Sequence, residues 1–151
     1  MEGLLHKFYS AFASGDHATM GACYHDQARF SDPVFPDLDA CGARAMWKML
    51  LNGGTDLRIT FKVLEENASG GRCRWEAFYT FSKTGRPVHN VVTSAVKFKD
   101  GLIVKQVDDF DFWHWSRQAL GMSGVLLGWT PIVRNKVRSM AADRLRKAMA
   151  G

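Results

Sequence analysis

Residues 8–33, FYSAFASGDHATMGACYHDQARFSDP, carry the pattern that decides the fold. Apolar residues at helical spacing predict a first helix over residues 2–13, and a Ser-Gly pair ends it. Asp16 is a favourable N-cap for a second, short helix that reaches about Tyr24. The following residues, DQARFSD, predict a short extended segment, which Pro33 ends.

Beyond this stretch, the periodicity changes from helical to alternating. A proline-containing loop runs through Cys41, and residues 43–51 predict a third helix that Asn52, Gly53 and Gly54 end. Alternating apolar and polar residues then predict antiparallel strands joined by glycine-containing turns. These strands are expected over residues 57–63, 72–82, 88–98 and 102–113. Helices followed by an antiparallel meander indicate an α+β domain with the helices on one face of the sheet.

The C-terminal residues 116–151 differ from the rest in charge. They hold seven Lys and Arg residues against one acid, whereas residues 1–115 hold 13 basic and 14 acidic residues. Because the basicity is confined to the tail, we do not expect nucleic-acid binding. We interpret residues 1–115 as the main domain and residues 116–151 as a helical extension of the same domain.

The final helix is predicted over residues 131–149, with proline in its first turn. Its apolar stripe consists of Ile132, Val133, Val137, Met140, Ala141, Leu145 and Met149, with most basic residues on the other side. We expect this amphipathic helix to pack on the domain or on a second subunit. Contact with an anionic membrane surface is the less favoured alternative.

Composition narrows the class of protein further. No apolar run reaches the roughly 20 residues that a bilayer requires. Cys23, Cys41 and Cys73 match neither a disulfide framework nor a CxxC metal site. No signal peptide is evident, so we expect a cytoplasmic protein. We expect no metal and no cofactor, since neither a metal-ligand spacing nor a phosphate-binding glycine loop occurs.

Residues 8–33, together with residues 97–113, KFKDGLIVKQVDDFDFW, resemble the SnoaL-like branch of the nuclear transport factor two-like superfamily. Ketosteroid isomerases and limonene epoxide hydrolases share this fold, and the resemblance covers about residues 4–115. It implies a cone-shaped α+β barrel, whose curved antiparallel sheet closes around an apolar pocket. It also favours a homodimer.

An isomerase-like pattern implies a proton-shuttling base at Asp32, immediately before a proline. Burial in an apolar cavity would raise the pKa of this carboxyl and suit it to proton abstraction beside a carbonyl. Equally, Asp-Pro could open a turn through local hydrogen bonds. The pattern's oxyanion tyrosine aligns with Phe8, next to Tyr9, and its assisting acid aligns with Ser94. Loss of such donors argues against steroid isomerisation.

An epoxide-hydrolase-like pattern implies an acid–arginine–acid set at Arg74, Glu76 and Asp108. Arg74 and Glu76 are two residues apart on one strand, so they share a face. The alternatives are a solvated strand face for this pair and a structural salt bridge for Asp108. If Asp108 points inward with Gln106, it must be protonated, paired or hydrogen-bonded, because a buried charge is costly.

The expected site therefore combines four polar candidates with an apolar lining. The catalytic candidates are Asp108, Asp32, Arg74 and Glu76. The expected substrate-binding residues are Phe8, Tyr9, Phe12, Trp47, Phe78, Ser94, Phe110 and Phe112. We expect a small apolar ligand, with acid/base catalysis of the hydrolase, isomerase or cyclase type. The alternative is a non-catalytic ligand-binding or accessory protein.

Overall fold

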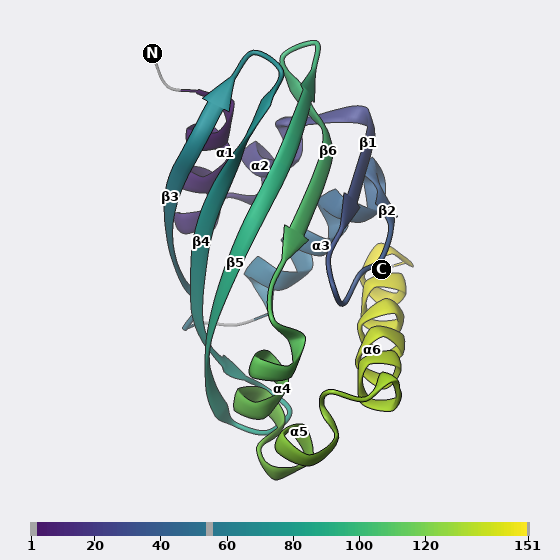
Figure 1. Cartoon of the computed structure of the whole chain (residues 1–151). Helices are drawn as coiled ribbons and strands as arrows, with labels where there is room; N and C mark the ends of the chain where they lie inside the picture. Colours follow the sequence, from purple (N-terminus) through teal and green to yellow (C-terminus); the bar gives the residue numbers. More distant parts are fainter. Residues whose placement is uncertain (1–2, 54–55, 151) are drawn as a thin grey trace.

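The computed structural model describes residues 3–53 and 56–150, and within them a curved sheet of six strands carries helices on one face (Figure 1). The elements in chain order are α1 (Leu4–Ala13), α2 (His17–Ala22), β1 (Tyr24–Ser31), β2 (Leu38–Asp39), α3 (Ala40–Asn52), β3 (Arg58–Asn67), β4 (Gly70–Phe81), β5 (Arg86–Lys99), β6 (Leu102–Asp109), α4 (Phe112–Leu120), α5 (Met122–Leu127) and α6 (Pro131–Ala150). Glu2 and Gly54, expected at helix ends, lie outside the described residues.

Aspartate caps fix the starts of α2 and α3. The Asp16 carboxylate accepts the amide of Thr19 at 3.0 Å, which confirms it as the N-cap of α2. Helix α3 starts three residues earlier than predicted, because Asp39 caps it by accepting the amide of Gly42 at 2.7 Å. Cys41 therefore lies in this helix and not in the preceding loop.

The sheet has the order β2-β1-β6-β5-β4-β3. Strands β3 to β6 form the predicted antiparallel meander. The expectation of a wholly antiparallel, closing sheet is wrong, since β1 pairs in parallel with β6 and the sheet stays open. Strands β1 and β6 are separated by 70 residues, and a parallel pair needs such a long connection. No local turn in the sequence therefore predicts this pairing. The α+β cone architecture is otherwise confirmed.

The last strand ends at Asp109, and the prediction that it continues to Trp113 is wrong. The Asp111 carboxylate accepts the amide of His114 at 3.0 Å and so caps α4. Phe112 and Trp113 consequently lie in the first helical turn. A capping aspartate thus overrides the alternating pattern that DDFDFW continues.

The interior is aromatic and centres on Trp47 of α3. Phe8 and Phe12 of α1 and Trp75 of β4 approach its ring edge-on, with ring centroids 5.9, 4.9 and 6.3 Å away. Phe30 of β1 approaches similarly at 5.6 Å. Such edge-to-face arrangements are favourable beyond the area that they bury. The helical layer is therefore fixed to the sheet by ring packing.

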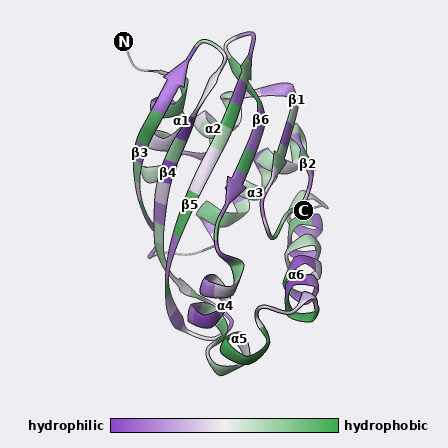
Figure 2. Cartoon of the chain, viewed as in Figure 1, coloured by the Kyte–Doolittle hydropathy of each residue, from purple (hydrophilic) through white to green (hydrophobic). Residues whose placement is uncertain are grey.

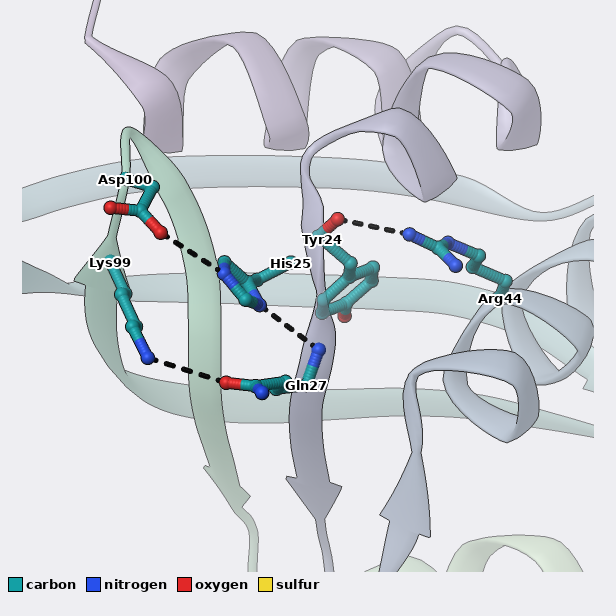
Figure 3. A network of polar contacts seen from close by, with 6 residues as sticks. All are labelled: Tyr24, His25, Gln27, Arg44, Lys99 and Asp100. Carbon is teal, nitrogen blue, oxygen red and sulfur yellow. Dashed lines mark hydrogen bonds and ion pairs between the residues drawn. The ribbon is translucent and has the colours of Figure 1, made fainter.

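A polar network joins the start of β1 to the β5–β6 hairpin (Figure 3). The amide of Gln27 donates to His25 Nδ1 at 3.0 Å, and His25 Nε2 lies 3.2 Å from an Asp100 carboxylate oxygen. Since Nδ1 accepts, the proton of the imidazole must be on Nε2, which donates to Asp100. Lys99 donates to the Gln27 side chain at 3.3 Å, and Arg44 of α3 donates to the carbonyl of Tyr24 at 3.0 Å.

Helix α6 lies beside the main domain and packs on it along part of its length (Figure 1). Leu145 is buried, and Ala141 packs against the main core. The Nε of Arg138 donates to the carbonyl of Pro33 at 2.8 Å. The predicted stripe is only partly buried, because Ile132 and Met149 are exposed. Within the described residues, no helix is long and apolar enough to cross a membrane.

Candidate functional site

Asp108 lies on the inner face of β6 and is almost fully buried. Its neighbour across the ladder is Ser94 of β5, which in turn faces Cys73 of β4. All three positions point to the interior, and Gln106 does the same two residues earlier. Of the two faces that alternation left open, the structure places Asp108 and Gln106 on the inner one. Burial raises the pKa of the Cys73 thiol to about 12, so this group stays protonated.

Hydrogen-bond donors converge on one oxygen of Asp108. The hydroxyl of Tyr9 donates to Ser94 Oγ at 2.5 Å, and the Ser94 hydroxyl donates to Asp108 Oδ1. The side-chain amide of Gln106 also donates to Oδ1, at 3.1 Å. The other oxygen, Oδ2, is buried with no hydrogen-bond partner among the described residues. A buried carboxyl oxygen of this kind favours a proton on it or a polar group brought by a ligand.

A second chain of hydrogen bonds holds the Gln106 amide in place. Trp47 Nε1 donates to the hydroxyl of Tyr24 at 2.8 Å, and that hydroxyl donates to Gln106 Oε1 at 2.5 Å. Burial raises the pKa of both Tyr9 and Tyr24 well above the usual value, so both phenols remain protonated donors. The amide orientation of Gln106 follows from this chain.

The electrostatics single out Asp108 and Asp32. Burial raises the pKa of Asp108 to about 7, against the lowering effect of the Ser94 and Gln106 hydrogen bonds, and the charge of Asp32 raises it further. Burial also raises the pKa of Asp32 to about 6, opposed by backbone amides and by Arg138. Two interacting carboxyls that titrate near neutrality are a recurrent feature of acid/base sites.

Asp32 organises a turn by local hydrogen bonds, and its carboxyl also has a raised pKa. Its Oδ1 accepts the amides of Val34 at 2.7 Å and Phe35 at 2.6 Å, so it organises the loop after β1. Arg138 of α6 bonds to the carbonyl of Pro33 in the same loop. The loop therefore links Asp32 to the C-terminal helix.

The structure excludes Arg74, Glu76 and Phe78 from this interior, so the predicted acid–arginine–acid set is wrong. Arg74 is exposed on the outer face of β4. Glu76 lies on the same face, with its Oε1 2.9 Å from His89 Nε2. Phe78 stacks on the His89 ring with centroids 4.3 Å apart. Alternation predicts which residues share a face, but here the interior face belongs to Cys73, Trp75 and Ala77.

The remaining predicted lining residues divide into three groups. Phe8, Phe12 and Trp47 are buried in the aromatic core, while Tyr9 and Ser94 belong to the Asp108 network. Phe110 is half-buried, and Phe112 joins a second apolar cluster with Val88, Trp115 and Ala119. Sequence reasoning missed the roles of Tyr24 and Gln106, although alternation in β6 had put Gln106 on the same face as Asp108.

Asp108 does not line either of two grooves on the described surface. One, of about 440 Å³, lies between α6 and the loop that Asp32 organises, and its lining includes Val34, Phe35 and Leu145. The other, of about 420 Å³, lies between α2 and α3. The groove beside α6 borders Val34 and Phe35, whose amides donate to Asp32. Among the described residues, no group of three or more His, Cys, Asp and Glu side chains could hold a metal ion.

Comparison with known proteins identifies the family. The sequence model of the SnoaL-like domain matches residues 5–106, and the chain therefore belongs to the SnoaL-like family. The matched region contains every element from α1 to most of β6, and it ends before α4, α5 and α6. A comparison with curated proteins finds no match.

Solved structures of the same fold confirm the architecture. IdmH of Streptomyces antibioticus, a proposed polyketide cyclase, is 22% identical with a TM-score of 0.64, over 79% of this chain and 96% of that one. A proposed isomerase from Rhodopseudomonas palustris is 14% identical, with a TM-score of 0.67 over 80% and 98% of the two chains. AclR of Streptomyces galilaeus, a proposed hydroxylase, is 15% identical, with a TM-score of 0.62 over 95% and 92%. At these identities the likeness concerns the fold alone.

Proposed function

We propose that the chain is an acid/base enzyme that moves protons beside a carbonyl group of a small apolar substrate, in a reaction of the cyclase or isomerase type. The observation that carries this proposal is the buried Asp108 carboxyl, whose pKa is about 7 and whose Oδ2 has no hydrogen-bond partner in the described part of the chain. Names of structural neighbours, such as polyketide cyclase and isomerase, are consistent with this chemistry.

The two carboxyls suit different roles. Asp32 has the lower pKa, about 6, and is mostly ionised at neutral pH, so it is assigned as the base that removes a proton from the carbon next to the carbonyl. Asp108, with a pKa of about 7, keeps a larger protonated fraction. Its Oδ2–H then donates to the enolate oxygen that forms, and the proton on Asp32 returns to carbon in the product. Environments that separate two carboxyl pKa values commonly divide the roles in this way.

Substrate reaches the carboxyls from the groove beside α6. The groove borders Val34 and Phe35, whose amides hold Asp32. The hydrogen bond between Arg138 and Pro33 must break for α6 and the loop to separate. Opening of a loop of this kind is a common step before catalysis.

The test is enolisation of aryl ketones such as 1-tetralone in deuterated buffer, with proton loss at the α-carbon followed by NMR. Wild-type chain is expected to accelerate exchange, and Asp108→Asn and Asp32→Asn each to reduce it by about 100-fold or more. Asp109→Asn is the matched control, because Asp109 is adjacent but exposed on the opposite face. The proposal is refuted if the wild-type chain gives exchange no faster than buffer alone. It is also refuted if Asp108→Asn and Asp109→Asn exchange at equal rates.

A non-catalytic binder is the second candidate, and the groove geometry favours it. Asp108 lines neither groove, whereas the groove beside α6 is partly apolar and open to a ligand. This candidate predicts that 1-tetralone binds in calorimetry without exchange, and that Leu145→Lys, within the groove, weakens binding while Asp108→Asn does not.

A further inference from the structure

Helix α5, the turn after it and the start of α6 lie at one end of the molecule (Figure 1), and much of this segment is hydrophobic (Figure 2). Large apolar side chains of this segment are exposed. We call this surface the α5 tip, and it consists of Met122, Val125, Leu126, Leu127, Trp129 and Ile132. Their exposed fractions run from 45% to 77%. Contiguous apolar exposure of this kind marks an interaction surface more often than single exposed residues do.

The packing of α5 explains why these side chains point outward. A Cβ atom added at Gly124 would lie 1.9 Å from the carbonyl oxygen of Ser116, and one at Gly128 would lie 2.0 Å from Ser116 Oγ. Helix α5 thus contacts α4 through a face that has no room for side chains. Turning the helix to bury Leu126 would bring a bulky group into that contact. The glycine spacing therefore fixes the apolar residues on the solvent side.

The chain segment that contains the tip carries charge of one sign. Residues 112–142 contain no Asp or Glu, and they include Arg117, Arg134, Lys136 and Arg138. Arg134 and Lys136 are exposed on the first turns of α6, directly after the tip. The Arg134 guanidinium lies 5.4 Å from the centroid of the Phe112 ring. Exposed apolar side chains next to exposed basic residues complement a bilayer, whose interior is apolar and whose surface is anionic.

We propose that the α5 tip docks on the surface of an anionic lipid bilayer. Leu126 and Trp129 enter the headgroup region, where indole rings are favoured, while Arg134 and Lys136 face lipid phosphates. A second copy of the chain fits less well, because a two-fold contact of this surface with itself would bring the same cations together. This inference is independent of the proposed acid/base chemistry.

The experiment is co-sedimentation of the full chain with vesicles of phosphatidylcholine alone or mixed with phosphatidylglycerol. We expect binding to the mixed vesicles only, and a loss of at least tenfold in Leu126→Glu and Trp129→Glu. Lys136→Gln is expected to weaken binding about fivefold, from roughly 1 kcal/mol per basic residue at such a surface. Leu64→Glu and Lys97→Gln, at exposed positions of β3 and β5, are matched controls that should retain full binding.

Circular dichroism establishes that each variant is folded, and Met122→Glu, at a position 72% exposed, replaces any variant that is not. Equal sedimentation with both vesicle types would overturn the proposal, as would equal losses in Leu126→Glu and Leu64→Glu. Sedimentation velocity tests whether a second copy of the chain occupies the α5 tip instead. A dimer that Leu126→Glu dissociates, without vesicle binding by the wild type, would assign the tip to a second copy and overturn the proposal too.

Discussion

Replacing Asp108 with asparagine is expected to change how the stability of the chain depends on pH. A buried acid whose pKa rises from 3.8 to about 7 on folding holds its proton more tightly in the folded state. Its contribution to stability is therefore fully present below about pH 4, and it is lost as pH rises through 7. The gap of about three pH units corresponds to about 4 kcal/mol of unfolding free energy.

Asparagine keeps the contacts of this site without the charge. Its Oδ1 can accept from Ser94 and Gln106, as the Asp108 oxygen does. Its amide nitrogen takes the place of Oδ2, which has no partner among the described residues. The protonated aspartic acid would have an unpaired donor at the same place, so the two side chains are comparable there. Asp108→Asn should thus resemble the wild type near pH 4 and exceed its stability near pH 8 by up to about 4 kcal/mol.

Urea unfolding followed by tryptophan fluorescence, between about pH 4 and pH 8, measures this difference. Asp109→Asn on the exposed face of β6 is the control, and its curve should run parallel to that of the wild type. If the curve of Asp108→Asn also runs parallel to the wild type, Asp108 has no raised pKa, and the electrostatic account of the site is refuted.

Three further predictions concern the same interior and the tail. Asp32→Asn is expected to lower the pKa of Asp108, because it removes a neighbouring negative charge, and carboxyl carbon NMR titration measures this change. Tyr9→Phe removes the donor to Ser94 and should reduce the free energy of unfolding by about 1–2 kcal/mol in urea titrations. Gly124→Ala, whose Cβ would meet the Ser116 carbonyl, should cost about 2 kcal/mol, whereas Gly85→Ala, at an open turn with positive φ, provides a comparison without a steric contact.

Local signals in the sequence predicted much of the fold. Apolar residues at helical spacing predicted the early helices, and alternating apolar residues predicted the meander. The Asp16 cap was recognisable from its position. Asp39 and Asp111 are equally good caps, but each follows residues whose extended or proline-rich pattern suggested a loop or strand instead. The parallel pairing of β1 with β6 has no local signature at all.

The candidate site was predicted in part. Alternation in β6 placed Asp108 and Gln106 on one face, and the structure shows that this face is the inner one. The same alternation in β4 could not tell which face is the interior, so Arg74 was assigned to the wrong side. The hydrogen bond from Tyr9 to Ser94 joins residues 85 positions apart, and such contacts depend on the assembled fold.

The pH dependence of ketone enolisation tests the central claim most directly. If Asp32 acts as an ionised base with a pKa of about 6 and Asp108 as a protonated acid with a pKa of about 7, the kcat/KM of the wild type follows a bell. Its maximum lies between about pH 6 and pH 7, and Asp108→Asn loses the limb on the alkaline side. A rate that rises continuously through pH 8, or that equals the rate in buffer, would contradict the account.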